Sequence, residues 1–320
     1  MKAPSALNGV VVVDKPAGMT SHDVVDRARK LFRTKRIGHT GTLDPDATGV
    51  LVLCLGVATR LAEYLSASRK HYVAEVVFGI ETDTQDASGQ VLAERDASAL
   101  TAEAVRALLP QFEGTISQVP PMVSALHHQG KRLYELAREG ITVERAARTV
   151  QIDRIALRQF VPGRHPVATL EVTCSTGTYI RTLAADIGAA AGYGGMMQSL
   201  RRTWVGSGAG EGDRAFTLEA AHTLEELEAR AREGTLAEVV LPLRAALVSW
   251  PQVRLEAGEL ARLQHGQSVR WSDIPPAPWQ KREALTPETP VAVLDLAGEV
   301  CAIARAEAGQ LRPVKVLTQL

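Results

Sequence analysis

The sequence predicts an α+β protein that combines a large N-terminal domain with a small C-terminal β-barrel. Apolar residues recur at helical spacing over residues 24–32, as in a helix that packs one face on a core. Polar and apolar residues alternate over 71–78, which is typical of an antiparallel strand with one exposed face. After about residue 247, short apolar runs separated by turns replace this mixed pattern. We therefore expect one domain over residues 1–247 and a second over 248–320.

In the first domain, strand and helix signals follow one another along the chain. Residues 10–14 are predicted to form a strand, and Thr20 or Ser21 caps the helix that follows. A loop from Gly38 to Gly49 then leads into an apolar strand. The remaining elements expected in this domain are strands over 50–55, 71–78 and 167–174 and helices over 101–112, 179–191 and 218–233.

Residues 114–145 differ from the elements on either side of them. They contain Pro120-Pro121, His127-His128 and the basic Gly130-Lys131-Arg132, followed by a short predicted helix over 133–138. A polar, basic excursion between core elements is more typical of a functional loop or lid than of a core. We therefore expect a thumb-like insertion here that contacts a ligand.

The C-terminal domain is predicted from short strands. The strand candidates lie over residues 253–255, 268–271, 291–296, 300–306 and 313–317. Residues 273–290 contain five prolines and are predicted to form a loop. This pattern indicates a small β-barrel of about seventy residues.

Zero net charge conceals an uneven distribution of charge along the chain. The net charge is +4 over residues 1–75, −5 over 76–120, +4 over 121–214 and −3 over 215–320. The first basic segment places six Lys and Arg residues between positions 27 and 36 with no acid among them. Such a run is often a solvated helix face, but it is also typical of a surface that binds nucleic acid. The cations expected on such a surface are Arg33, Lys35, Arg36 and, from the second basic segment, Lys131.

Composition argues against several classes of protein. The longest apolar stretch, Val50–Ala58, is far shorter than the ~20 residues that span a bilayer, and the valines of residues 10–13 are too few for a signal peptide. Cys54, Cys174 and Cys301 have no paired spacing, and the histidines show no zinc-binding pattern. We therefore expect a cytoplasmic protein with reduced cysteines, no membrane association and no bound metal.

The loop from Gly38 to Gly49 is the strongest candidate for a site of chemistry. Its three glycines allow positive φ angles and a close approach to a ligand. Pro45 lacks an amide hydrogen and keeps Asp44 out of a helix. Asp44 is therefore held in an irregular loop that feeds directly into an apolar strand, which suits a carboxylate with a fixed geometry. An Asp-Pro turn without any chemistry remains the alternative for this loop taken alone.

The same residues also match a second pattern. Asp44-Pro-Asp46-Ala-Thr48 fits the Asp-x-Asp-x-Thr pattern of magnesium-dependent aspartyl phosphatases. In that family the first Asp ends a hydrophobic strand. Here the preceding residues 37–43 are rich in Gly and Thr, and the strand follows the motif. The context therefore argues against a phosphatase.

The loop and its flanks resemble the TruB family of tRNA pseudouridine synthases, which isomerise the uridine at position 55 in the T-loop. Gly38-His-Thr-Gly-Thr-Leu-Asp-Pro-Asp-Ala-Thr-Gly-Val-Leu51 is similar to the defining loop of that family. Segments 9–18, 70–72 and 174–182 match further motifs in the family's order, and the stretches 120–134 and 199–202 also fit. In their pattern of short strands and turns, the last seventy residues are similar to the PUA-type RNA-binding domain that some members carry.

The resemblance implies a role for each matching residue. Asp44 corresponds to the catalytic carboxylate and Arg181 to its ion-pair partner. Arg201 and Arg202 are expected at the RNA surface. Some members have an apolar residue at the position of Asp46, and we expect its carboxylate to point away from the pocket, because two facing carboxylates would raise each other's pKa.

Five further residues are implied to serve the substrate. Tyr72 corresponds to the aromatic residue on which the flipped uracil stacks, and Tyr179 to a ribose or base contact. His39 resembles the residue that supports the disrupted T-loop, Leu200 an apolar wall of the pocket, and Lys15 a structural support nearby.

The resemblance also implies a fold and a reaction. The expected fold is a mixed, largely antiparallel sheet flanked by helices, with a PUA-like domain at the C-terminal end. The reaction cleaves the C1′–N1 bond, rotates the base and joins C1′ to C5, with no cofactor. The expected partner is the T-arm of tRNA, bound by a monomer. A non-catalytic protein that binds or folds RNA through the same surface is the main alternative.

Overall fold

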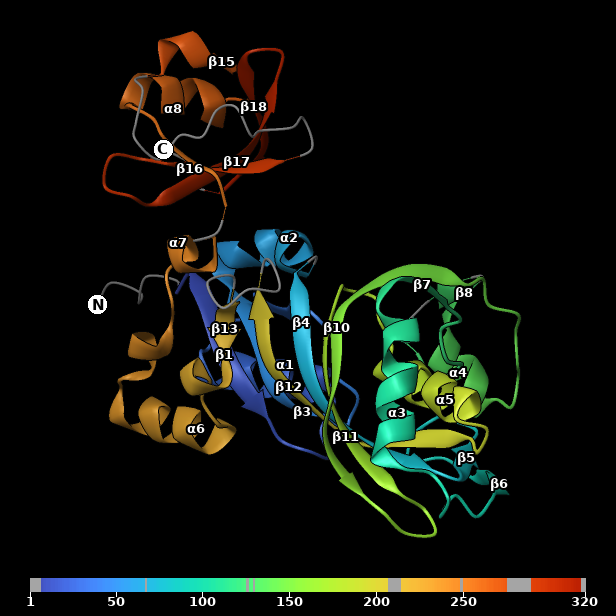
Figure 1. Cartoon of the computed structure of the whole chain (residues 1–320). Coiled ribbons are helices and arrows are strands. Elements are labelled where there is room, and N and C mark those ends of the chain that lie inside the picture. Colours follow the sequence, from blue (N-terminus) through green and yellow to red (C-terminus); the bar gives the residue numbers. More distant parts are fainter. Residues whose placement is uncertain are drawn as a thin grey trace.

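The computed structural model describes residues 7–66, 68–124, 127–128, 130–206, 214–247, 250–274 and 289–317. Within these residues, a large mixed sheet with helices on its faces lies below a smaller curled sheet formed by the C-terminal part of the chain (Figure 1). The α+β fold class expected from the sequence is confirmed. No helix in the described part of the chain is long and apolar enough to cross a membrane.

The large sheet is antiparallel except at one pair of neighbours. Its strand order is β1-β3-β12-β4-β11-β10-β7, and β2 and β13 pair with β3 and β12 outside this path. Among the described strand pairs of this sheet, only β3 and β12 run parallel, with Thr48 and Gly49 facing Arg201 and Arg202. The strands of this sheet are β1 (Gly9–Lys15), β2 (Ile37–His39), β3 (Thr48–Leu55), β4 (Arg69–Phe78), β7 (Gly114–Gln118), β10 (Arg148–Val161), β11 (Val167–Cys174), β12 (Gly195–Gly206) and β13 (Arg214–Thr217).

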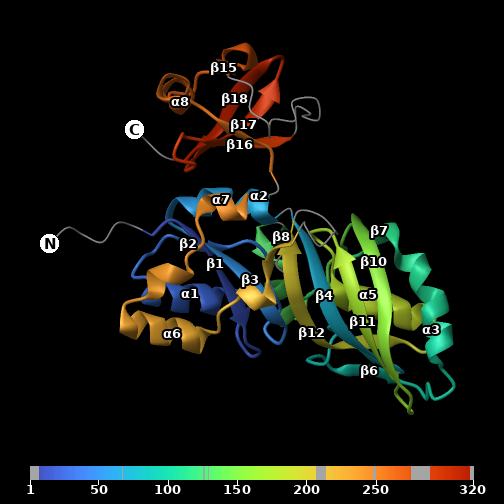
Figure 2. The ribbon, with the colours of Figure 1, turned by 60° about the vertical axis from the view of Figure 1, so that its left-hand side comes forward.

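Helices cover β1 and β3 on both faces. Successive side chains of a strand point to opposite sides, so Val11 and Val13 pack with α1 (Ser21–Leu31) and α6 (Leu224–Glu233). Val10 and Val12 pack on the other side, in a cluster that includes residues of α2 (Ala62–Ser66), α7 (Leu243–Ala246) and the C-terminal sheet. Figure 2 shows α1 and α6 on one side and α7 and α2 beneath the small sheet.

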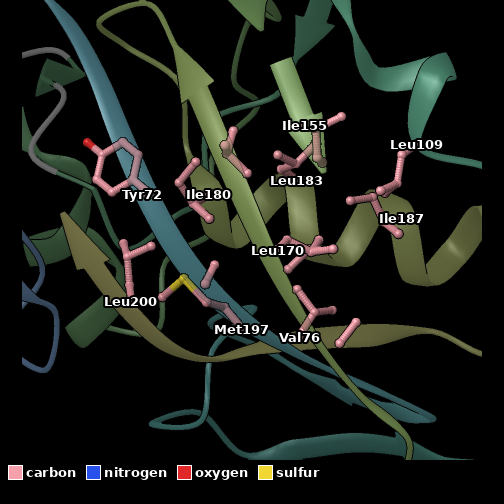
Figure 3. Packing of buried hydrophobic residues seen from close by; sticks show 14 of the residues in the cluster. Tyr72, Val76, Leu109, Ile155, Leu170, Ile180, Leu183, Ile187, Met197 and Leu200 are labelled. Carbon is pink, nitrogen blue, oxygen red and sulfur yellow. The ribbon is translucent and has the colours of Figure 1, made fainter. Parts of the chain in front are cut away.

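A second core lies where β4, β10 and β11 meet α5 (Ile180–Ala190) and α3 (Ala102–Leu108). Leu183 and Ile187 of α5 pack toward Leu170 and Val76 of the sheet (Figure 3). This packing fixes the helix that begins beside the Gly38–Gly49 loop. The core therefore positions two candidate site segments relative to each other.

The C-terminal sheet has the order β14-β16-β17-β18-β15 and carries one helix, α8 (Ala257–Gln264). It is joined to the large domain by polar as well as apolar contacts. The Lys315 Nζ donates to the Arg60 carbonyl at 3.1 Å, and it also pairs with Glu63. The strands of this sheet are β14 (Gln252–Arg254), β15 (Val269–Arg270), β16 (Pro290–Leu294), β17 (Val300–Glu307) and β18 (Gln310–Val316).

The remaining elements are short. They include the hairpin strands β5 (Ile80–Thr82) and β6 (Val91–Glu94), the paired β8 (His127–His128) and β9 (Lys131–Arg132), and α4 (Leu133–Arg138). Short 3-10 helices lie at Gly56–Leu61, Leu109–Phe112, Leu218–Ala220, Leu236–Val239 and Trp271–Asp273.

Several sequence expectations need correction. The thumb-like excursion was expected to begin at residue 114, but Gly114–Gln118 is a strand of the large sheet that pairs with β10. The helix expected over 218–233 is broken, because a new helix begins after Thr223. The Thr223 hydroxyl accepts from the Glu226 amide, and the Glu226 carboxylate accepts from the Thr223 amide. Strands β10 and β12 and helix α8 were not predicted at all. The loop expected over 273–290 lies largely outside the described residues.

Candidate active site

The Gly38–Gly49 loop connects β2 to β3 and is tied to α1 as well as to the sheet. The Ser21 hydroxyl donates to the Leu43 carbonyl at 3.1 Å and accepts from the Leu43 amide at 2.8 Å. At the end of the loop, Gly49 has a φ of +100°, and a Cβ there would lie 2.1 Å from the Arg202 carbonyl oxygen. Glycine is therefore required where the loop enters the parallel pairing with β12.

Asp44 forms a two-point ion pair with Arg181. The Arg181 Nη2 donates to Asp44 Oδ1 at 3.1 Å, and Nε lies 3.0 Å from Oδ2. Arg181 is the second residue of α5, after the N-cap Tyr179. The arginine side chain is 4% exposed, whereas that of Asp44 is 37% exposed. The carboxylate is thus held from the protein side and remains open on the other.

A second carboxylate, Asp86, contacts the same arginine. Its Oδ2 lies 3.4 Å from Arg181 Nη1, and its Oδ1 accepts hydrogen bonds from Thr84 and Ser88 in its own turn. The Val123 carbonyl accepts a further bond from Arg181 Nη2 at 2.8 Å. Arg181 therefore lies between two acids and is also bonded to the backbone.

Sequence reasoning missed Asp86. Its only local signal is the turn chemistry of the Thr, Asp and Ser residues around it. The hairpin of β5 and β6 brings it to Arg181 by docking on β12, where the Ala87 amide donates to the Met197 carbonyl at 3.0 Å. That contact joins distant parts of the chain, and composition does not reveal it.

The surroundings of Asp44 raise the pKa of its carboxyl above the usual Asp range. Burial is the main cause, because it disfavours the charged form. The Arg181 guanidinium opposes the rise, and the nearby Asp86 carboxylate adds to it. Arg181 thus limits how far burial can neutralise Asp44.

An apolar wall lies next to this ion pair. Tyr72 of β4 is 7% exposed and belongs to the same cluster as Leu43, Ile180 and Leu200. Figure 3 shows Tyr72, Ile180 and Leu200 at one end of that cluster. Burial raises the pKa of the Tyr72 hydroxyl, so the phenol stays neutral. The structure therefore brings Asp44, Arg181, Tyr72 and Leu200 to one place, as the sequence predicted.

Tyr179 directly precedes α5 beside this place, and His39 lies near the start of the Gly38–Gly49 loop. Tyr179 is half-buried, and burial raises the pKa of its hydroxyl. His39 ends β2 and pairs with Leu53 of β3. Burial lowers the pKa of its imidazole, and the Arg202 guanidinium lowers it further. His39 is thus a neutral side chain at neutral pH.

Lys15 is a support of the loop and is closed to substrate. Its side chain is fully buried, and Nζ donates to the carbonyls of Pro16, Met19 and Pro45 at 2.8, 2.6 and 2.7 Å. Burial lowers the pKa of this ammonium to about 8. All three of its protons are occupied by carbonyl oxygens. The lysine therefore fixes the backbone next to Asp44.

The expectation that Arg202 lies at the RNA surface is wrong. Arg202 is 1% exposed, and its guanidinium donates to the Val50 carbonyl at 2.6 Å and to the Gly41 carbonyl at 3.1 Å. Neighbouring residues of a strand point to opposite sides, so Arg202 points under the loop while Arg201 is 42% exposed. Arg201 itself pairs with Asp14 at 2.7 Å.

The basic run at the end of α1 divides into two groups. Arg27 pairs with Glu228 at 2.6 Å, and Arg29 pairs with Asp26 at 2.8 Å. Arg33, Lys35 and Arg36, which follow the helix, are exposed. The expected RNA contact Lys131 belongs to β9, but its side chain lies outside the described residues.

Two further expectations concern acidic residues and metals. Asp46 is exposed, whereas Asp44 is only partly exposed. Among the described residues, no group of three or more His, Cys, Asp or Glu could hold a metal ion. All three cysteines are free and buried.

Comparison with known proteins identifies the family. The description "TruB family pseudouridylate synthase (N terminal domain)" matches residues 29–180, and "tRNA pseudouridylate synthase B C-terminal domain" matches residues 181–248. The chain belongs to the TruB family. It is therefore a pseudouridine synthase, an isomerase, as the resemblance predicted.

Individual TruB relatives cover most of the chain. "tRNA pseudouridine synthase B" of Symbiobacterium thermophilum is 50% identical over 83% of this chain and 84% of its own length. The protein of the same name from Burkholderia mallei is 44% identical over 98% of both chains. Among solved structures, a Cbf5-Nop10-Gar1 complex contains a chain with a TM-score of 0.73 and 25% identity, which covers 99% of this chain and 91% of that one.

Proposed function

We propose that this TruB-family enzyme isomerises uridine to pseudouridine in tRNA, at position 55 of the T-loop, with Asp44 as its essential carboxylate. The observation that carries the proposal is the two-point ion pair of Asp44 with Arg181 beside the apolar wall of Tyr72 and Leu200. The names of the relatives, tRNA pseudouridine synthase B, support tRNA as the substrate. The match of the loop sequence supports the T-arm.

The geometry suits a reaction that needs one carboxylate and no electron transfer. The C1′–N1 bond of uridine breaks, the base rotates, and C1′ joins C5. The proton at C5 is then lost while N1 regains one, so the product is an isomer. A carboxylate can assist as a nucleophile on the sugar or as a base. Arg181 favours the ionised form that both roles need.

The target base must leave the stack before it can reach Asp44. Extrusion costs a few kcal/mol, and stacking on an aromatic side chain returns ~1–3 kcal/mol. We assign the stacking role to Tyr72, because it is the aromatic side chain in the wall next to the ion pair. Tyr179 and His39 are proposed to contact the extruded nucleotide and the opened loop.

The rest of the RNA is proposed to lie on the exposed cations. Arg33, Lys35 and Arg36 are exposed beyond α1, and Arg201 is partly exposed on β12. Phosphate contacts of this kind position RNA without reading its sequence. We further propose that residues 248–320 form a PUA-like RNA-binding domain and that the enzyme acts in the cytoplasm as a monomer on the T-arm stem-loop.

The test compares two carboxylates of the same loop. Purified wild-type protein, Asp44→Asn and the control Asp46→Asn are incubated with an unmodified T-arm hairpin, and pseudouridine is quantified. We expect Asp44→Asn to fall below about 1% of the wild-type rate, a loss of about 3 kcal/mol in transition-state stabilisation, while RNA binding stays within a few-fold. Asp46 is exposed, and Asp46→Asn should keep the wild-type rate within a few-fold. Substantial turnover by Asp44→Asn contradicts the assignment.

The same assay separates the alternatives. A protein that only binds or folds RNA would bind the hairpin and form no pseudouridine in the wild type. A magnesium-dependent reaction at Asp44 and Asp46 would stop with EDTA and return with magnesium on a hairpin whose melting is unaffected. We expect the chelator to leave the rate unchanged.

A further inference from the structure

The side-chain amide of Gln118 is bonded to the backbone of a residue in the active site. Its Oε1 accepts from the Tyr179 amide at 2.9 Å, and its Nε2 donates to the Tyr179 carbonyl at 3.1 Å. Gln118 is 1% exposed. A buried amide with both ends satisfied by one residue fixes that residue strongly, because losing either bond leaves a buried polar group without a partner.

The local sequence explains why a side chain has this role. Gln118 is the last residue of β7, and Pro120 and Pro121 follow it. Proline has no amide hydrogen, so residues 120 and 121 cannot donate to a continued ladder. A glutamine amide carries a carbonyl acceptor beside N–H donors, so it can pair with both the N–H and the C=O of one residue. It therefore pairs with Tyr179 as an additional strand residue would.

Tyr179 is the residue on which the first turn of α5 depends. It is the N-cap of the helix, and its own side chain makes no capping bond. Its carbonyl accepts the Leu183 amide at 3.0 Å, the first bond of the helix, in addition to the Gln118 amide. Its backbone amide is one of the groups that a helix leaves without an internal partner. Gln118 satisfies that amide.

Arg181 lies two residues further along this turn. The segment that begins at Gln118 also reaches the arginine side chain, through the Val123 carbonyl at 2.8 Å from Nη2. Residues 118–123 thus hold both the backbone before Arg181 and the guanidinium that pairs with Asp44. Small displacements of such a group matter, because misplacement by about 1 Å can cost about 100-fold in rate.

We propose that Gln118 is a positioning residue for the Asp44–Arg181 pair, which it aligns by fixing the N-cap of α5. The inference rests on the proposed roles of Asp44 and Arg181. Gln118 does not touch the reacting atoms. Its contribution is to hold Arg181 at the distance at which the guanidinium keeps Asp44 ionised.

The test replaces the amide by a side chain of similar shape. Gln118→Met keeps the length and removes both hydrogen bonds. Gln151→Met is the control, because Gln151 lies on the neighbouring strand β10 and its side-chain oxygen accepts from the Thr115 hydroxyl at 2.8 Å, a residue that does not belong to α5 or its N-cap. Single-turnover rates at saturating T-arm hairpin are measured against pH, together with hairpin affinity and melting temperature.

We expect Gln118→Met to lose at least 10-fold in rate with hairpin affinity within about three-fold, and its acidic limb to move to higher pH. Gln151→Met should keep the wild-type rate and pH profile. If Gln118→Met does not fold, Gln118→Asn, which keeps an uncharged amide on a shorter side chain, should show the same changes to a smaller degree. A variant that melts earlier but retains the wild-type rate and pH profile would overturn the proposal.

Failure of this proposal can be told from failure of the proposed function. If Asp44→Asn is inactive and Gln118→Met behaves as the wild type, only the role of Gln118 is wrong. If Asp44→Asn is active, the assignment on which both rest is wrong.

Discussion

Two groups of buried cations hold the Gly38–Gly49 loop, and they differ in what they bind. On the side of the pocket, Arg181 meets the carboxylates of Asp44 and Asp86. Behind the loop, Lys15 donates to the carbonyl of Pro45 and Arg202 to the carbonyls of Gly41 and Val50. Both groups remove charge from water, which is costly without good partners.

The difference separates chemistry from support. A backbone carbonyl does not titrate, so Lys15 and Arg202 can fix the loop at any pH at which they are charged. The pKa of the Asp44 carboxyl responds to its neighbours, because Arg181 and Asp86 shift it in opposite directions. Replacement of a cation on the pocket side should therefore change rate and pH profile. Replacement of one behind the loop should mainly change stability.

The largest effect is expected for Arg181→Met. The substitution leaves Asp44 without its partner, and we expect the rate at saturating hairpin to fall by about 10²–10³-fold, as for removal of one preorganised charge contact. Because an opposite charge favours the ionised acid, the pKa of Asp44 should rise further. The acidic limb of the pH–rate profile should move to higher pH. A normal rate with an unchanged profile would show that the pair does not operate in catalysis.

Asp86→Asn should shift the acidic limb of the pH–rate profile in the opposite direction from Arg181→Met. The amide keeps the shape of Asp86 but removes a negative charge that raises the pKa of Asp44. We expect the acidic limb to move to lower pH. The rate on its plateau should fall by about 10-fold, roughly 1.4 kcal/mol, because Arg181 loses one of its two acids. Limbs that move in the same direction in Asp86→Asn and Arg181→Met would contradict this account.

Lys15→Met tests the group behind the loop. It leaves three carbonyls without their donor, and we expect a loss of about 2–4 kcal/mol in the free energy of unfolding at pH 7, with the rate of folded protein within a few-fold. The pKa of Lys15 is lowered to about 8 by burial, so between about pH 8 and 10.5 the unfolded chain binds more protons. The wild type should therefore gain stability relative to the variant over that range. If the difference in the free energy of unfolding between the wild type and Lys15→Met narrowed as pH rose, the hydrogen bonds to the carbonyls would outweigh burial in setting the pKa of Lys15.

The smallest effect on turnover is expected at the exposed cations, which belong to neither group. Replacing Arg33 and Lys35 together with Ser should weaken hairpin binding and make the log–log dependence of affinity on salt shallower by roughly one to two units. Turnover at saturating RNA should remain. A salt titration beside the wild type decides this, and identical slopes would identify the run as a solvated helix face.

The strands were predictable where polar and apolar residues alternate regularly along the whole strand. β4 alternates cleanly and was recognised, whereas β10 and β12 were not. Both contain register shifts, in β12 between Met197 and Ser199 and between Arg202 and Trp204. A bulge reverses the alternation partway along a strand, so the period of two that identifies strands is lost.

The sequence motifs identified the residues of the candidate site but did not show which of their side chains are buried. Asp44, Tyr72, Arg181 and Leu200 were expected to meet, and they do. Arg202 was assigned to the RNA surface from the resemblance of residues 199–202 to the family. Its burial depends on carbonyls that a loop distant in sequence presents to it, and only the folded chain shows this.

The long sequence separations within the site have a consequence for how the enzyme is made. Arg181 follows Asp44 by 137 residues, and Arg202 follows Gly41 by 161. At about 5–20 residues per second, a ribosome needs roughly 7–30 s to supply these partners after the loop has been synthesised. Contacts so distant also slow folding. The newly synthesised loop therefore lacks both its counterion Arg181 and the supporting side chain of Arg202. Activity should appear only after β12 has emerged.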